Sequence, residues 1–134
     1  MGQVNGEKKS IYTEIPDHFL KYITKDFSQM PIDLSFLEEI SSSKYLSLVD
    51  FQGLPSEMPF LNRIEILAKF ERLTGLPCSL PNLTSFLIST DKILDDLQGF
   101  PHYAPKLKRL DIRGEYYSFK GLPDSLPSLE ELWM

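Results

Sequence analysis

Hydrophobic positions recur in a fixed order along most of this chain, and the order restarts at four glycines that lie 22, 24 and 22 residues apart. Each copy begins with a glycine, an apolar residue and a proline. Two variable residues and a second apolar–proline pair come next. One variable residue, a leucine and two further apolar positions complete the copy. The copies begin at Gly53, Gly75, Gly99 and Gly121 and read GLPSEMPFLNRIEI, GLPCSLPNLTSFLI, GFPHYAPKLKRLDI and GLPDSLPSLEELWM. Self-similarity with a period in the twenties is typical of a repeat protein.

A more divergent copy precedes these four. Residues 30–40 (MPIDLSFLEEI) match residues 54–64, keep the first proline at Pro31, and have Ser35 and Gln29 in place of the second proline and the glycine. At 134 residues the chain is expected to be one domain. The pattern therefore predicts four repeat units and a partial fifth, with the boundaries 29–52, 53–74, 75–98, 99–120 and 121–134.

The end of each copy has the alternation of a β-strand, in which successive side chains face opposite ways. We expect the first, fourth and sixth core positions to point inward. One repeat cannot bury these residues alone, whereas stacked neighbours bury them as continuous columns. In the three central copies the predicted inward residues are Leu61, Ile64, Ile66, Leu83, Phe86, Ile88, Leu107, Leu110 and Ile112.

The paired prolines predict the path by which the chain returns from one strand to the next. Proline has no N–H and disfavours helix at the preceding residue, so two per repeat argue against a long helix there. We expect extended return segments, with a short 3₁₀ turn at most, and positive φ at the repeat glycines. The pairs are Pro55 and Pro59, Pro77 and Pro81, Pro101 and Pro105, and Pro123 and Pro127.

The strand segments LNRIEI, LTSFLI, LKRLDI and LEELWM resemble the leucine-rich repeat, and the resemblance covers residues 29–134. It implies an α/β-type leucine-rich-repeat solenoid, with parallel strands on a concave face and extended or 3₁₀ segments on the convex face. The family usually has Asn or Cys three residues after the last core position, to bond the backbone of the turn. In this chain that position holds Lys69, Asp91 and Glu115, so we expect other groups to satisfy the backbone hydrogen bonds of the turns.

The first 28 residues lie outside the repeat. Residues 1–10 are expected to form a disordered tail. In residues 11–28, Phe19, Leu20, Ile23 and Phe27 have the spacing of one helical face, and Pro16 suits the start of a helix. This spacing predicts an N-terminal helical cap that covers the first repeat. The alternative is an amphipathic helix that binds a membrane or a protein partner. The N-terminal MGQVNG also resembles a signal for myristoylation of Gly2.

Composition narrows the classes of partner. The chain has 14 basic and 19 acidic residues and a net charge of −5. This balance argues against nucleic acid and makes an anionic membrane an unlikely default partner. The polar N-terminus lacks the apolar region of a signal peptide. A single cysteine forms no internal disulfide, which favours a cytoplasmic location.

Few residues suit catalysis. His18, His102 and Cys78 do not have the spacing of metal ligands, so we expect no metal, no cofactor and no enzyme activity. A nucleophilic pair formed by Cys78 and His102, on neighbouring repeats, is an alternative. The basic run at residues 106–109 is a second alternative, as a phosphate site, although Asp111 lies beside it.

The variable strand positions are expected to line the concave face, where solenoids bind their partners. The pattern predicts three rows across the strands, and it allows Arg109 to pair with Glu131. The rows are Glu39, Arg63, Ser85, Arg109 and Glu131; then Ser41, Glu65, Leu87, Asp111 and Trp133; then Ser43, Leu67, Ser89 and Arg113. The predicted partner-binding residues are Arg63, Glu65, Leu67, Leu87, Arg109, Asp111, Arg113, Glu131 and Trp133.

These observations predict a non-catalytic protein–protein interaction module that binds a protein partner on its concave face. The alternative, implied by the resemblance, is the substrate-recognition arm of a larger ubiquitin ligase or GTPase. A membrane-tethered adaptor is the third interpretation. The last repeat ends at its strand, for which three explanations stay open. The chain is a piece of a longer protein, which we rank first, or copies self-associate through the open end, or the last strand frays.

Overall fold

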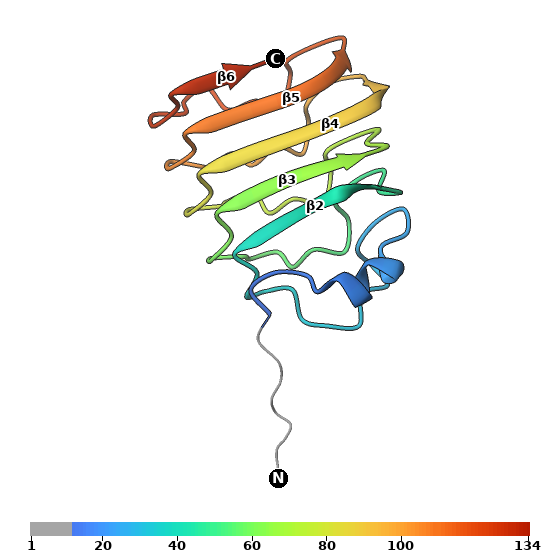
Figure 1. Ribbon diagram of the computed structural model, residues 1–134. Coiled ribbons are helices and arrows are strands. Elements are labelled where there is room, and N and C mark those ends of the chain that lie inside the picture. Colours follow the sequence, from blue (N-terminus) through green and yellow to red (C-terminus); the bar gives the residue numbers. More distant parts are fainter. Residues whose placement is uncertain (1–11) are drawn as a thin grey trace.

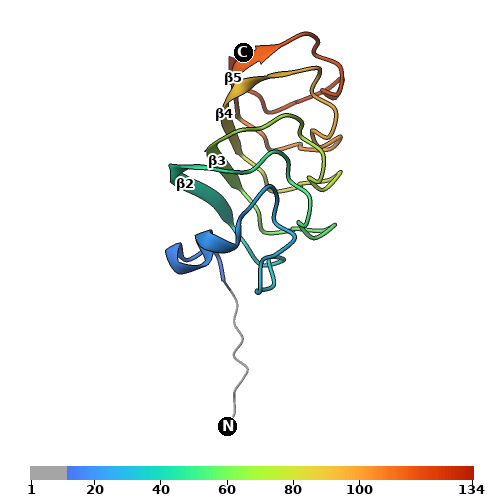
Figure 2. The same ribbon diagram turned by 90° about the vertical axis from the view of Figure 1, so that its right-hand side faces the viewer.

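The computed structural model describes residues 12–134, which form a solenoid built on one parallel five-stranded sheet (Figure 1). The strands lie in the order in which they occur along the chain, so each repeat contributes one rung. Figure 2 shows the sheet on one side of the molecule and the return segments on the other. The strands are β2 (Glu39–Leu46), β3 (Arg63–Ala68), β4 (Ser85–Leu94), β5 (Arg109–Tyr116) and β6 (Glu131–Trp133).

The predicted inward columns form the core. Parallel pairing places Ile40, Ile64, Phe86, Leu110 and Leu132 side by side on successive strands. All nine inward residues predicted for the three central repeats are at most 2% exposed. The prediction of stacked apolar columns is therefore confirmed.

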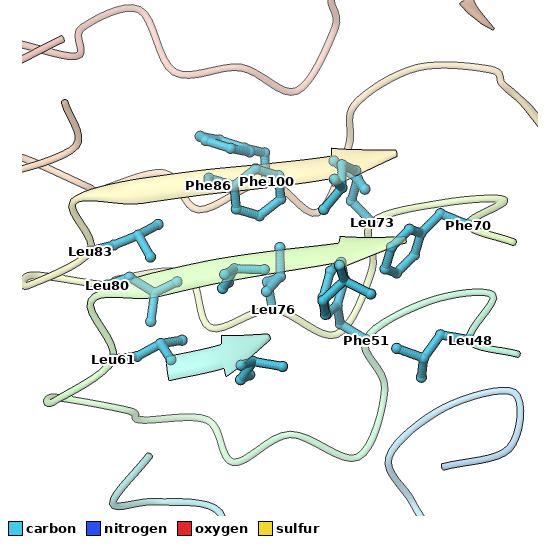
Figure 3. Packing of buried hydrophobic residues seen from close by; sticks show 14 of the residues in the cluster. Leu48, Phe51, Leu61, Phe70, Leu73, Leu76, Leu80, Leu83, Phe86 and Phe100 are labelled. Carbon is cyan, nitrogen blue, oxygen red and sulfur yellow. The ribbon is translucent and has the colours of Figure 1, made fainter. Parts of the chain in front are cut away.

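Five phenylalanines connect neighbouring rungs inside the coil, and Figure 3 shows four of them, Phe51, Phe70, Phe86 and Phe100. The Phe51 ring stacks on Phe27 and Phe70, with centroid distances of 6.4 and 4.8 Å. The Phe86 and Phe100 rings meet edge to face at 5.1 Å. All five side chains are fully buried, and each stabilises the fold by roughly 1.5–3 kcal/mol through apolar burial.

The repeat glycines lie where one rung touches the backbone of the previous rung. Gly75 and Gly99 have φ of +108° and +101°, and the other two repeat glycines are also positive, as predicted. A Cβ on Gly75 would lie 2.2 Å from the carbonyl carbon of Phe51, and one on Gly99 would lie 2.5 Å from that of Leu73. Any side chain would therefore push neighbouring rungs apart.

Hydrogen bonds between rungs satisfy the backbone groups of the turns after the strands, where no Asn or Cys stands at the third position after the strand core of the three central copies. The Thr90 hydroxyl donates to the Phe70 carbonyl at 2.8 Å. The Glu71 N–H donates to the Val49 carbonyl at 2.9 Å, and the same kind of backbone bond recurs at later rungs. The ladder of the sheet thus continues past the strand ends.

A column of aspartates orders the turns three residues before Gly53, Gly99 and the equivalent Gln29. Asp26, Asp50 and Asp96 each accept a hydrogen bond from the backbone N–H two residues later, at 2.9, 3.1 and 3.0 Å. Asp50 is buried and also accepts from Arg72 Nε of the next rung at 3.2 Å. These short local bonds hold the chain in the turn that leads into each repeat.

The N-terminal segment contains less helix than its hydrophobic spacing predicts. Its one helix is the six-residue 3₁₀ helix η1 (Asp17–Tyr22), which contains no buried residue. Ile23 and Phe27 are buried but lie beyond η1. The helix ends there because the following residues make rung contacts instead: Lys25 accepts a hydrogen bond from the Val49 N–H at 2.7 Å. The predicted tail, residues 1–10, and the N-terminal lipidation signal lie outside the described residues.

This segment makes the backbone contact that every later rung repeats. The Thr13 carbonyl accepts hydrogen bonds from the N–H groups of Glu38 and Glu39 at 2.7 and 3.2 Å. The Glu38 carbonyl then accepts the equivalent pair of bonds from Asn62 and Arg63. Residues 12–28 therefore continue the stack as an irregular rung below β2.

The return segments are extended and turn-like, as the proline pairs predict. Between β2 and β6 the chain contains no helix, and a single isolated parallel bridge joins Ser79 to Tyr103. Across residues 12–134, no helix is long and apolar enough to pass through a bilayer.

We predict that Gly99→Ala lowers the free energy of unfolding by about 2 kcal/mol or more, because alanine disfavours positive φ and its Cβ meets the backbone of the rung below. Urea unfolding followed by circular dichroism measures the change. Ser125→Ala, on an exposed return segment, is the control and should change stability little. Equal unfolding midpoints for Gly99→Ala and wild type would contradict the close-approach argument.

We also predict a pH dependence at Asp26. Hydrogen bonds from the Ser28 hydroxyl and N–H lower the pKa of its carboxyl. A lowered folded-state pKa gives stability that is present above the unfolded value of about 4 and lost as the pH falls through the folded value. Asp26→Asn should therefore lose less stability than wild type between about pH 5 and pH 2. Exposed Asp124→Asn should track wild type, and identical acid profiles for all three proteins would refute the prediction.

Candidate binding face on the sheet

The face of the sheet turned away from the return segments, here called the open face, carries the variable strand residues. The register confirms two of the three predicted rows. Each row crosses neighbouring strands, which lie about 4.8 Å apart. The first row is Glu39, Arg63, Ser85, Arg109 and Glu131, and the second is Ser41, Glu65, Leu87, Asp111 and Trp133.

The third row differs from the prediction at β2. Tyr45, and not Ser43, pairs with Leu67, because a bulge between Ser41 and Tyr45 inserts two extra residues. Inside the bulge the Ser42 hydroxyl accepts the Lys44 N–H at 3.0 Å. The correct third row is therefore Tyr45, Leu67, Ser89 and Arg113.

The bulge places Tyr45 in a contact that skips a strand. Its hydroxyl donates to Asp91 Oδ1 at 2.9 Å, reaching from β2 over β3 to β4. Desolvation and the Asp91 carboxylate raise the pKa of Tyr45, so the hydroxyl keeps its proton and remains the donor. Asp91 itself lies in a second bulge, between Ser89 and Ile93.

Sequence reasoning missed this pair, although repeat length carried a signal for it. The repeats at residues 29–52 and 75–98 have 24 residues, and the repeats that follow them have 22. The two bulges fall in these longer repeats, and each adds two residues relative to the next strand. A longer repeat thus indicates a bulge after its strand core.

A groove of about 500 Å³ crosses the middle of the open face. It brings together six of the nine predicted binding residues: Glu65, Leu67, Leu87, Arg109, Asp111 and Arg113. Leu67 is 43% exposed, so an apolar side chain faces solvent between charged neighbours. Arg63, Glu131 and Trp133 lie on the same face but outside the groove lining.

At the β5 side of the groove, one buried carboxylate serves two arginines. Asp111 is 1% exposed and accepts from Arg113 Nε and Nη2 at 3.2 and 3.1 Å, and from Arg109 Nη2 at 3.5 Å. The hydrogen bonds and charge of Asp111 raise the pKa of Arg113. Arg109 Nε is buried and has no hydrogen-bond partner among residues 12–134.

The predicted pairing of Arg109 with Glu131 is wrong. Glu131 is the register neighbour of Arg109 on β6, yet the ion pair that forms is with Asp111. A buried carboxylate needs compensating donors more than an exposed one does, and Asp111 lies two residues along the same strand, on the same face.

On the β3 side, the acidic groups already have partners. Arg63 forms an ion pair with Glu65, which raises the pKa of Arg63. The Ser41 hydroxyl donates to Glu39 Oε2 at 2.7 Å. The β3 side of the face therefore has fewer charged groups available to a ligand than the Asp111 cluster.

The last rung exposes residue types that are buried elsewhere. Leu132 and Met134 occupy the columns of the buried Leu110 and Ile112, yet they are 56% and 41% exposed. Trp133 is 58% exposed. Within residues 12–134, β6 pairs with β5 alone, so no further rung covers these side chains.

The outer side brings Cys78 and His102 onto adjacent rungs, as the repeat offset predicts. What links them is backbone, because the His102 N–H donates to the Cys78 carbonyl at 2.8 Å. In residues 12–134 no group of three or more His, Cys, Asp or Glu side chains is placed to hold a metal ion. In the basic run, Lys106 bonds Asn82 and Arg109 bonds Asp111, so its charges point to different partners.

Comparisons with known proteins identify no relative. No protein-family model matches the chain, and neither a curated protein nor a solved structure matches it. The functional argument therefore depends on the geometry of the open face.

We predict that Asp111→Ala lowers the free energy of unfolding by about 1–3 kcal/mol, because it leaves a partly buried arginine without its acceptor. Arg113→Ala should cost less, since that side chain is 70% exposed and its ion pair is screened by solvent. Urea unfolding compares the two variants. If Arg113→Ala is the more damaging change, Asp111 is not the centre of the cluster.

Proposed function

We propose that this chain is a non-catalytic protein-interaction module whose open face binds a protein partner. One observation carries the proposal: the groove combines solvent-exposed Leu67 with the charged cluster of Arg109, Asp111 and Arg113. Apolar surface rimmed by polar groups is typical of interaction sites. Arginine and tryptophan are the residue types most enriched at binding hot spots, and Trp133 lies beside Asp111 on the same face.

Rigid display is the mechanism we propose. Backbone hydrogen bonds join every rung to the next, and the buried columns hold the strands in register. The variable side chains are therefore presented from fixed positions, and binding does not have to order the backbone first. Specificity would come from which side chains occupy the three rows.

We assign the repeat to the leucine-rich type and the location to the cytoplasm. The first assignment is supported by the repeated GLPxxLPxLxxLxI pattern together with the parallel-strand coil. The second is supported by the single cysteine. We also propose that residues 12–28 cap the coil, since they contribute Ile23 and Phe27 to its core.

We predict that the double variant Trp133→Ala, Arg109→Ala loses the proteins that wild type captures in a pull-down quantified by mass spectrometry. The expected loss is roughly tenfold, the size of a hot-spot change of about 1.4 kcal/mol. Tyr103→Ala removes a similarly exposed aromatic side chain from a return segment and should capture the same proteins as wild type. Equal capture by all three proteins would refute binding on the open face.

A further inference from the structure

We propose that the groove binds an extended peptide segment in which a carboxylate side chain lies two or three residues from an apolar one. The carboxylate pairs with the Arg109–Arg113 cluster, and the apolar side chain packs on Leu67 and Leu87. This inference rests on the proposed function, because it names the kind of segment that the open face takes.

The charge balance of the groove favours an acidic ligand group. Its lining contains Glu65, Asp111, Arg109 and Arg113. Glu65 is neutralised by Arg63, which lies outside the lining. Asp111 neutralises one of its two arginines, so the cluster keeps one positive charge.

The hydrogen-bond inventory leads to the same conclusion. The Asp111 carboxylate is buried and fully engaged by its two arginines. Arg113 is 70% exposed, and its Nη1 makes no hydrogen bond to any residue from 12 to 134. Arg109 Nε is buried and has no hydrogen-bond partner in the described part of the chain. Unmet donors thus remain on the arginines, and guanidinium groups bind carboxylates through paired hydrogen bonds.

The nearby carboxylates do not take this role. Asp91 is held by the Tyr45 hydroxyl. Glu131, the register neighbour of Arg109, forms no ion pair with it in the described part of the chain, and Glu131 does not line the groove. An incoming carboxylate therefore meets the cluster from the groove side, and the negative charge of Glu131 on the neighbouring strand weakens its binding.

The spacing of the strands sets the spacing of the ligand. Leu67, Leu87 and Arg113 stand on β3, β4 and β5, so the leucines and the arginine lie one or two strands apart, about 5–10 Å. Side chains on one side of an extended peptide repeat about every 7 Å. A peptide that crosses the strands thus places an apolar and an acidic side chain two or three residues apart. Ser43 and Ser89 line the same groove and offer hydroxyls to the peptide backbone.

The test is selection of a random linear peptide library displayed on phage, with the wild-type chain immobilised. We expect the enriched peptides to share Asp or Glu two or three positions from Leu, Ile, Met or Phe. Selection on Arg113→Glu should replace the acidic residue with Lys or Arg. Enrichment without an acidic residue, an unchanged preference on Arg113→Glu, or no enrichment at all would each overturn the inference.

The strongest selected peptide is then synthesised and titrated by fluorescence polarisation. Arg113→Ala should weaken its binding roughly tenfold, as expected for an ion pair worth about 1.4 kcal/mol, and Arg113→Lys should restore part of the loss. Glu131→Gln should bind as well as wild type or better, and Lys120→Ala, a cation outside the groove, should bind unchanged. Loss of binding with Lys120→Ala equal to that with Arg113→Ala would show a general charge effect and contradict the proposal.

The two proposals fail separately. If selected peptides require Leu67, tested as Leu67→Asp, but contain no acidic residue, the open face binds and only the peptide class is wrong. If the pull-down shows equal capture by the Trp133 and Arg109 double variant, the proposed function fails as well. Circular dichroism of each variant confirms that the exposed substitutions leave the fold intact.

Discussion

The contact between each glycine turn and the backbone of the preceding rung is the constraint on which the other features of this solenoid depend. At Gly75 and Gly99 the turn lies so close to its neighbour that a Cβ would overlap backbone atoms. This approach lets the N–H and C=O groups of successive turns bond directly. The same spacing brings Phe51 onto Phe70 and Phe86 onto Phe100.

The arrangement of side chains on the open face follows from the constant spacing of the rungs and from two bulges that interrupt it. Because the rungs are held at one spacing, side chains in equivalent positions form straight rows across the strands. The two-residue bulges in β2 and β4 break the rows on one side of the sheet. They bring Tyr45 and Asp91 together across β3. The groove lies beside this contact, so its shape depends on the irregular residues as much as on the repeat.

Electrostatics on the face are decided by burial. Asp111 is almost completely buried, and it therefore binds the two arginines on its own strand in preference to leaving them to Glu131. The result is a cluster with more donors than acceptors next to exposed Leu67. We argue that this combination, and not the net charge of −5, determines which ligand the face takes.

Much of the fold was predictable from the sequence, because the determining interactions are local and recur with the repeat. The apolar alternation predicted the strands and their buried columns. The proline pairs predicted return segments without helix, and the glycines predicted positive φ. Two of the three rows on the open face followed from counting along the repeat.

The remaining features were decided only by tertiary contacts. Which carboxylate pairs with Arg109 depends on the relative burial of Asp111 and Glu131. The place of Tyr45 depends on a bulge whose two extra residues leave the register of the core unchanged. The N-terminal helix ends at Tyr22 because the backbone groups of Lys25 and Phe27 bond to the next rung. The spacing of Phe19, Leu20, Ile23 and Phe27 suits a longer helix. The repeated sequence pattern therefore determined the path of the backbone. The groove depends on which side chains from different rungs meet, and only the tertiary structure decided that.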